Sequence, residues 1–542
     1  MPADPSPPVE PVLDAGQIQG NVVPGFMKPS MAVSALVIED VGKAKSWIAA
    51  TAPRITTLAQ AMETREQVRA LRTLRPLVAG TLGAIPDEVD DQWVNVGFSH
   101  QGLGKLLAGG SHEADLEQFE DEAFSAGLAA RSSLLGDPTD PAAEGNPANW
   151  VVGGPGQDAD VLLVFGADRP EALAEVLQEV RDDATANGMA VLYEEQGAKL
   201  DDVGSEHFGF QDGVSQPGVR GRYSDDPDSF VTQRTIDPSA VPDSWLYGLP
   251  GQLLVWPGEF VFGYPGAGAD PLVAGAVNLP GPEWSRNGSY LSFRRLRQDV
   301  PGFWRFLTEQ AGQLAGQPGF EGWTAERLGA NLIGRWKSGA PVARVPDADV
   351  PELGVDRLAN NNFGFAADSE ALPLVGGGSD AFPEAEADPV GLTCPLAAHI
   401  RKVQPRETPN DLGGRRASQS RRLLRRGLPY GPQMTDPFGP DPADGDRGLL
   451  FVSYQASLRE QFEFLCTTWM GSPLNPRSPS GFDMVVGENG QPGEGRVKQC
   501  VLFGTGAAQG AVSSDSDFVI PTGGGYFFSP SIGALTDVLA AQ

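Results

Sequence analysis

Hydrophobic and polar positions repeat one arrangement four times along the chain. Each copy starts with a short apolar run that is rich in β-branched residues. A polar break follows, and then a segment with the spacing of an amphipathic helix. The four apolar runs are Ala32–Val41, Val161–Gly166, Tyr290–Leu296 and Leu449–Tyr454. The pattern therefore predicts four strand–helix units.

Further apolar segments lie next to these units. Trp93–Phe98 separates the first two units, and Ala190–Glu194 follows the second. The resulting order, β-α-β-β-α-β, is that of a ferredoxin-like unit. The last two units could form a similar half, with Gly525–Phe528 as its closing strand. We therefore expect an α+β protein of two ferredoxin-like halves, each an antiparallel sheet with helices on one face.

The composition of the chain suggests how it is divided. Residues 1–15 are rich in proline and acid, which predicts a flexible N-terminal arm. Residues 16–225 are predicted to form the N-terminal ferredoxin-like domain, and residues 226–542 a C-terminal one with long loop insertions. Residues 344–388 are acidic and rich in glycine, and a loop of that length is typically functional or mobile.

The charge balance bears on the class of partner. The 542 residues include 40 basic and 70 acidic ones, which gives a formal net charge of −30. Nucleic acid requires a basic surface, so the balance argues against a nucleic-acid partner. Neutral or cationic partners are favoured instead.

The sequence gives only weak indications of the cellular compartment. Its three cysteines have no C-x-x-C spacing, so neither a zinc knuckle nor a disulfide framework is indicated. Their odd number fits a reducing compartment. No segment approaches about 18 uninterrupted apolar residues, so no membrane span is expected. The N-terminus has no signal-peptide pattern, and a cytoplasmic location is expected.

The first segment that could carry chemistry is Gly209–Gly213, with the sequence GFQDG. Asp212 lies between glycines and beside Phe208 and Phe210. A partly desolvated carboxylate in such a setting can accept and release protons. An ordinary Asp-Gly turn produces the same string, so the motif gains weight only together with later segments.

His399 is the most informative of the four histidines, which also include His100, His112 and His207. Pro395 fits the first position of a helix, and His399 would then lie on its apolar face. Such an imidazole is either a metal ligand or a satisfied core residue, and these residues alone favour the core. A metal site on Glu206 and His207 is a weaker alternative, because neighbouring side chains point in different directions.

Four arginines lie between residues 421 and 431. Arg421, Arg422 and Arg426 are interpreted as a solvated basic strip. Arg425 lies just before the constrained turn Gly427–Gly431 and is expected to point inward. A fixed guanidinium beside a carboxylate forms a useful pair, since the acid moves a proton and the cation stabilises negative charge on oxygen.

Together these segments resemble the dye-decolourising peroxidase family, a group of haem peroxidases. Gly209–Gly213 matches the family's G-x-x-D-G motif, Ala398–Lys402 its proximal-histidine segment, and Leu424–Gly431 its distal-arginine segment. Further matches are Ile18–Asn21 with Pro24 and Gly25, Asn287–Leu291, and Thr522–Phe528. They occur in the family's order from residue 18 to about residue 535, and the length resembles the larger-chain branch.

The resemblance implies one haem b per chain, held mainly by the C-terminal half. His399 would be the axial ligand of the iron, Asp212 the distal acid–base residue, and Arg425 the group that stabilises charge on the peroxide oxygens. Some members have an asparagine two positions after the distal arginine. Here that position is Gly427, so no amide can assist Asp212.

The resemblance also implies neighbours for these groups. A leucine and a phenylalanine line the family's distal face, and Leu449 and Phe451 are assigned to it. Plain strand core is nearly as good an interpretation of both. A carboxylate should bind the second nitrogen of the proximal histidine. Asp517 is assigned to this role, with Asp483 as the alternative.

The activity that the resemblance implies is a peroxidase. Hydrogen peroxide would oxidise aromatic reductants, such as dyes and phenolics, and also manganese(II), in one-electron steps through a ferryl intermediate. Bulky reductants would deliver electrons through surface residues. Two alternatives remain: a protein that binds haem or handles its iron with little peroxidase turnover, and a binding protein without chemistry.

Overall fold

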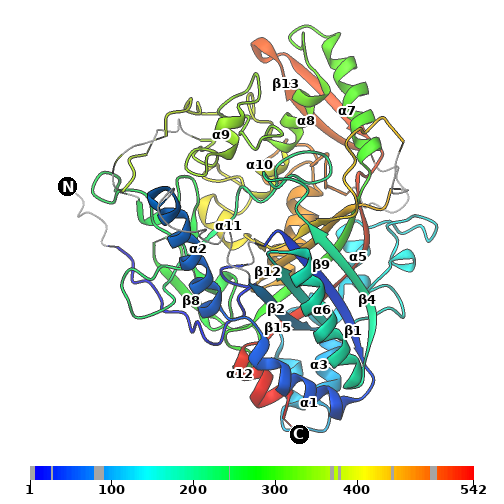
Figure 1. The fold of residues 1–542 in the computed structure, drawn as a ribbon. Coiled ribbons are helices and arrows are strands. Elements are labelled where there is room, and N and C mark those ends of the chain that lie inside the picture. Colours follow the sequence, from blue (N-terminus) through cyan, green and yellow to red (C-terminus); the bar gives the residue numbers. More distant parts are fainter. Residues whose placement is uncertain are drawn as a thin grey trace.

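The fold was analysed in a computed structural model of the chain (Figure 1). The structure describes residues 7–25, 28–78, 91–242, 244–270, 272–366, 372–375, 377, 380–440, 445–488 and 497–541. Within these ranges, no helix combines the length and the apolar character needed to cross a membrane.

The N-terminal half has the ferredoxin-like topology expected from the hydrophobic pattern. Its strands lie in the order β4-β1-β3-β2, and every neighbouring pair is antiparallel. Helix α1 follows β1, and helix α6 connects β3 to β4. The bounds of these elements are β1 Ser30–Ile38, α1 Val41–Thr51, β2 Gln92–Phe98, β3 Val161–Ala167, α6 Pro170–Ala186 and β4 Met189–Ala198.

The C-terminal half repeats this topology. Its strands lie in the order β15-β9-β12-β11, again all antiparallel, and the two-residue strand β10 pairs with β12 in line with β11. Helix α7 follows β9. The π-helical segments η7 and η8 follow β12. The bounds are β9 Ser289–Gln298, α7 Val300–Ala315, β10 Leu424–Arg425, β11 Leu428–Tyr430, β12 Gly448–Gln455, η7 Leu458–Glu463, η8 Leu465–Met470 and β15 Val519–Ser529.

The two four-stranded sheets join at both edges into one closed barrel. Tyr430 of β11 pairs with Gly197 of β4, and Phe528 of β15 pairs with Phe98 of β2. Closure removes the exposed sheet edges that two separate sheets would have. The prediction of two ferredoxin-like halves is confirmed. The sequence pattern did not predict that the two halves join into a single barrel.

Side chains alternate between the two faces of the barrel wall, as the two-residue period of a strand requires. On β1, Val33 and Ala35 face a core inside the barrel, while Ala32 and Leu36 pack beneath the outer helices. Both faces are buried, which explains why β1 is a nearly continuous apolar run. Figure 1 shows α1 and α6 against the outer side of this half.

Further elements surround the barrel. In Figure 1, α7, α8 and β13 gather at the end opposite α1, α3 and α12, and α10 lies between this group and the barrel. The remaining helices are α2 Leu58–Val78, α3 His100–Leu107, α4 Glu122–Ala126, α5 Leu128–Leu135, α8 Ala325–Ile333, α9 Pro351–Val355, α10 His399–Val403, α11 Arg415–Ser420 and α12 Ile532–Ala534. The remaining strands are β5 Gly218–Val219, β6 Leu254–Val255, β7 Tyr264–Ala267, β8 Ala274–Asn278, β13 Lys498–Phe503 and β14 Gln509–Ser514.

The flexible arm expected over residues 1–15 stays a prediction, although its second part contacts the rest of the chain. Glu10 accepts hydrogen bonds from Arg220 and Arg234, and Leu13 is buried in the inner core. Buried cations hold this segment in place because they need its carboxylate. Residues 1–6 lie outside the described residues. The predicted domain boundary at residues 225 and 226 stays a prediction, and it falls between the last strand of one half and β9.

Candidate active site

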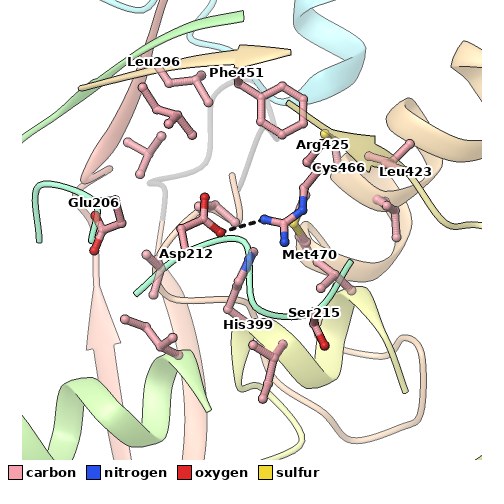
Figure 2. A pocket seen from close by; sticks show the side chains of 18 of the residues that line it. Glu206, Asp212, Ser215, Leu296, His399, Leu423, Arg425, Phe451, Cys466 and Met470 are labelled. Carbon is pink, nitrogen blue, oxygen red and sulfur yellow. Dashed lines mark hydrogen bonds and ion pairs between the residues drawn. The ribbon is translucent and has the colours of Figure 1, made fainter. Parts of the chain in front are cut away.

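A cavity between the barrel and α10 contains most of the residues that the sequence singled out (Figure 2). It measures ≈ 1820 Å³ with its open mouth included. Its walls come from the GFQDG loop, β9, β10, β12, α10 and the segments η7 and η8. Asp212, Arg425, His399, Leu449 and Phe451 all line it, so the structure brings together five of the six predicted site residues.

The GFQDG loop is held by hydrogen bonds on the N-terminal side of Asp212. Phe208 and Phe210 are buried, and their backbone N–H groups donate to the carboxylate of Glu206 at 2.8 and 2.9 Å. Gly213 has a φ of 77°, in the left-handed region that glycine adopts without strain. The loop thereby turns Asp212 toward the cavity, where 40% of its side chain is exposed.

Arg425 meets Asp212 directly. Its Nη1 donates to Oδ1 of Asp212 at 2.8 Å, as the dashed line in Figure 2 shows. Loss of water around Asp212 raises the pKa of this carboxyl. The charge of Arg425, the N–H of Gly213 and the charge of His399 outweigh that effect, so the net pKa lies below the ordinary value. Asp212 is therefore a carboxylate at neutral pH and can accept a proton.

Local packing fixes the position of Arg425. The residue ends β10, where it pairs with Ser453 of β12. A break of two residues then separates β10 from β11. At Gly427 a Cβ atom would lie 2.3 Å from the carbonyl oxygen of Leu450, so any larger residue would displace β12 or the loop. This contact explains why the asparagine found in some relatives has no place here.

His399 is the first residue of α10, which starts four residues later than the sequence predicted. Its Nδ1 lies 2.7 Å from Oδ2 of Asp483. Asp483 is fully buried, and its Oδ1 accepts the N–H groups of Val485 and Val486 at 3.0 and 3.1 Å. Because Nδ1 is occupied, Nε2 is the ring nitrogen that remains for a ligand in the cavity.

The pKa of Asp483 also lies below its ordinary value. Burial raises it, but the charge and hydrogen bond of His399 and the two backbone N–H groups outweigh burial. Asp483 therefore stays ionised beside the imidazole. A carboxylate in this position orients the ring and increases the basicity of the other nitrogen.

The assignment of Asp517 to this position is wrong, and the alternative, Asp483, holds it. Asp517 forms an ion pair with Lys498 at 3.3 Å. The Lys498 side chain is only 2% exposed. A buried ammonium group needs a counter-charge, which explains why Asp517 lies there.

Leu449 and Phe451 stand on alternate positions of β12 and line the cavity. Leu450 and Val452, between and beyond them, belong to the core inside the barrel. The two-residue period of the strand thus separates cavity-lining from core positions.

The predicted solvated strip of arginines is also wrong. Arg422 is buried and lines the cavity, and Arg426 donates to the backbone oxygens of Asn21 and Val22. Arg421 donates to the carboxylate of Glu460 at 2.7 Å and lies over the ring of Phe464. Burial is possible here because backbone oxygens, a carboxylate and a ring replace the water around these cations.

The remaining histidines have other contacts. His207 donates from Nε2 to the carbonyl oxygen of Tyr430 at 2.8 Å, and burial lowers its pKa to about 4. His112 lies 2.7 Å from Asp115, and the ring of His100 packs edge-on against Phe124. Among the described residues, no group of three or more His, Cys, Asp and Glu residues could hold a metal ion.

Comparison with known proteins shows to which family the chain is related. The family model for the DyP dimeric alpha+beta barrel domain matches residues 17–199, and that for the C-terminal part of Dyp-type peroxidases matches residues 353–475. The dye-decolorizing peroxidase of Mycena epipterygia is 30% identical over 98% of this chain and 88% of its own length. The chain belongs to the dye-decolorizing peroxidase family. It is therefore a peroxidase, and it depends on haem.

Other relatives and solved structures agree with this placement. The family member of Auricularia auricula-judae is 30% identical over 98% of this chain and 87% of its own. The structure of an ancestral D-type dye decolorizing peroxidase superposes with a TM-score of 0.74 at 31% identity, covering 99% of this chain and all of the other. A structure from Pleurotus ostreatus has a TM-score of 0.71 at 27% identity over 98% of this chain.

As expected for a dye-decolorizing peroxidase, the cavity has groups that fit haem. Aliphatic side chains such as Ile333, Val403 and Leu465 line it and could pack against a flat macrocycle. Nε2 of His399 would be free to bind the iron of a haem in this cavity. Asp212 and Arg425 would offer polar groups to a small ligand of the haem. The donor set thus fits one imidazole-bound iron.

A group of buried arginines provides an independent sign of fit. Arg335 and Arg422 line the cavity, and Arg406 lies behind them. Burial and the charges of its arginine neighbours lower the pKa of Arg335 to about 9, and its Nε has no partner. In the described ranges none of the three has a carboxylate within ion-pair distance. The acidic side chains of haem would supply the missing negative charge.

Sequence reasoning missed Arg335 altogether. It lies in Ile333–Trp336, directly after α8, and neither charge patterning nor periodicity marks it. Arginine is usually exposed, so the residues next to Arg335 in the sequence give no signal of its burial.

Proposed function

We propose that the chain uses haem b and hydrogen peroxide to oxidise dyes and other aromatic reductants at this cavity. The observation that carries the proposal is the pair of Arg425 and Asp212, joined at 2.8 Å, in the same cavity as an imidazole whose Nδ1 is held by Asp483. The names of the relatives, which are dye-decolorizing peroxidases, support the class of substrate.

The haem supplies the two-electron chemistry that cleaves peroxide, and the protein controls protons and charge around it. Asp212, ionised in the resting protein, takes the proton from the near oxygen of hydrogen peroxide and delivers it to the far oxygen. Such positioned proton transfer typically contributes about 10²–10⁴-fold to the rate. Arg425 stabilises the negative charge that develops on the oxygens and keeps Asp212 aimed at them.

On the other side, Asp483 keeps His399 in one orientation. The N–H at Nδ1 donates to the carboxylate, so Nε2 carries the lone pair for the iron. A more basic imidazole would favour a high oxidation state of a metal bound at Nε2. Asp483 is thus proposed to tune the reactivity through His399.

The electron donors in this proposal are aromatic reductants and manganese(II). Aromatic reductants small enough to enter could reach the cavity directly, and larger dyes would pass electrons through oxidisable residues at the surface. Manganese(II) remains a predicted donor. The acidic composition favours binding of cations in general, but no group of carboxylates in the described ranges singles out a manganese site.

The experiment that tests the proposal compares Asp212→Asn with the wild type in stopped-flow absorbance after mixing with peroxide. The variant should keep the haem and its resting spectrum but react with peroxide at least about 100-fold more slowly. Asp225→Asn, which removes an exposed acid outside the cavity, is the matched control. An undiminished peroxide step in Asp212→Asn would refute the proton-transfer role. A wild-type protein that binds haem without turnover would instead indicate haem handling.

A further inference from the structure

A second and larger cavity lies against the first. It shares Asp212, Arg425, Leu449 and Phe451 with the haem cavity, so the two meet at the proposed peroxide-binding side. It measures ≈ 2780 Å³ with its mouth included. We call it the antechamber. Its other walls come from α2, from residues 199–219, and from the segment around Arg357.

The antechamber is basic although the protein is strongly acidic. Its walls carry seven basic residues and three acidic ones, whereas the chain has 40 basic against 70 acidic. The basic residues are Lys28, Arg65, Arg69, Lys199, Arg357, Arg425 and Arg426, and the acidic ones are Asp202, Glu206 and Asp212. A basic cavity attracts anions and raises their local concentration, even though the protein as a whole is acidic.

Arg65 is the centre of this charge. Burial, followed by the charges of Arg357 and Arg69, lowers its pKa to about 10. Burial and then Arg65 likewise lower the pKa of Arg426 to about 9. These guanidinium groups therefore repel one another across the cavity. The Nε of Arg65 is buried and has no hydrogen-bond partner.

The acids of the antechamber do not neutralise these cations. Asp212 is already paired with Arg425, and the pKa of Glu206 is raised to about 7, mainly by burial. In the part of the chain that the structure describes, no carboxylate lies within ion-pair distance of Arg65, Lys199, Arg357 or Arg426. Lys28 is paired with Asp168 at 2.6 Å, so among the described residues the positive charge without a protein counter-charge belongs to Arg65, Lys199, Arg357 and Arg426.

The walls also define the body of a ligand. Met31, Met62, Val214, Leu424 and Phe451 add apolar surface to the same cavity. A ligand that fits both features has an anionic head and a compact apolar body. The planar fork of a guanidinium matches a carboxylate in particular, because two parallel N–H groups can meet its two oxygens.

We propose that the antechamber binds a small organic carboxylate, with its head at Arg65 and Arg357 and its body against Leu449 and Phe451. Such a ligand would stand between solvent and the Asp212–Arg425 pair. Resting on the proposed function, we infer further that the bound carboxylate slows the access of peroxide. Binding of the carboxylate is noncovalent: the carboxylate replaces solvent ions beside the arginines, and no covalent bond forms or breaks.

The test uses the haem-loaded protein and isothermal titration calorimetry. The probes are 2-naphthoate, the neutral 2-naphthalenemethanol of similar shape, and inorganic phosphate. We expect 2-naphthoate to bind, more weakly as salt rises, and the alcohol to bind at least about tenfold less tightly. Arg65→Gln with Arg357→Gln should weaken 2-naphthoate by roughly tenfold or more. Arg357→Gln alone changes only an exposed side chain and should weaken it about threefold or more.

Arg459→Gln is the matched control, because it removes an arginine that is 57% exposed and outside both cavities. Equal affinity of the double variant and this control would overturn the proposal, as would equal binding of acid and alcohol. If phosphate bound as tightly as 2-naphthoate, the inference that the ligand has an organic body would be overturned.

In stopped flow, saturating 2-naphthoate should slow the reaction of the wild type with peroxide. An unchanged rate would overturn the inferred effect on peroxide access. Binding of 2-naphthoate by a protein that never reacts with peroxide would instead refute the proposed function and leave the antechamber intact.

Discussion

Glu206 offers a sharp test of how the GFQDG loop is held. Its carboxyl group accepts the N–H groups of Phe208 and Phe210 and a hydrogen bond from Gln298. Burial nevertheless dominates and raises its pKa from 4.5 to about 7, with a smaller contribution from the charge of Asp212. The folded protein therefore binds a proton at Glu206 more tightly than the unfolded chain does.

The direction of the pH effect follows from this difference. Protonation of Glu206 favours the folded state, so its contribution is complete below pH 4.5 and is lost as pH rises to about 7. At 1.36 kcal/mol per pH unit, the difference between 4.5 and about 7 corresponds to ~3.4 kcal/mol. This value is an upper limit, since Glu206 faces a cavity that water can enter. Glu206→Gln abolishes the titration and keeps the shape.

The assay is urea denaturation at several pH values between about 5 and 8. Relative to the wild type, the free energy of unfolding of Glu206→Gln should rise with pH by up to ~3 kcal/mol, so the variant is comparatively more stable at the alkaline end. Glu309→Gln, which changes an exposed acid of α7, should run parallel to the wild type. If Glu206→Gln also ran parallel, Glu206 would titrate normally and our account of its burial would be wrong.

Three further predictions concern the groups that we propose surround the haem iron. Arg425→Gln should slow the peroxide reaction and move the acid limb of its pH profile upward, because Asp212 loses the charge that lowers its pKa; a profile with an unmoved limb would contradict the pairing. Asp483→Asn should weaken haem binding about 10–100-fold in transfer to a haem acceptor, whereas Asp517→Asn should not. An equal loss of haem affinity in both variants would contradict the assignment of Asp483, rather than Asp517, as the partner of His399. His399→Ala should lose or alter the Soret band of the purified protein, and an unaltered spectrum would exclude it as the ligand.

Strands β1 and β3 were predictable because both of their faces are buried. Val161–Ala167 is a continuous apolar run, and a run of this length and composition favours a buried strand. Strands β10 and β11 escaped because Leu424–Arg425 and Leu428–Tyr430 are short and contain arginine and proline. These two strands form because β12 lies beside them, and local propensity gives no information about such a distant neighbour.

The site was predictable where a motif carried the geometry and not where a distant contact did. Asp212, Arg425 and His399 lie in local patterns that a family resemblance can identify. The partner of His399 is 84 residues away in the chain, and spacing could not choose between Asp483 and Asp517. Arg422 and Arg426 were taken for solvated residues because the backbone oxygens and cavity that surround them come from other parts of the fold.

Closure of the barrel explains why the pair of Asp212 and Arg425 forms at all. The GFQDG loop follows β4 of the first half, and Arg425 ends β10 of the second, so pairing of β4 with β11 brings the two together. His207 reinforces this join by donating to the carbonyl oxygen of Tyr430 on β11. Gln216 also reinforces the join. Its Nε2 donates to the carbonyl oxygen of Arg425 at 3.3 Å, and its Oε1 accepts the N–H of Arg425 at 3.4 Å. Two ferredoxin-like sheets that remained separate would each hold half of the acid–base pair. The closed barrel is therefore a requirement of the proposed chemistry as well as of stability.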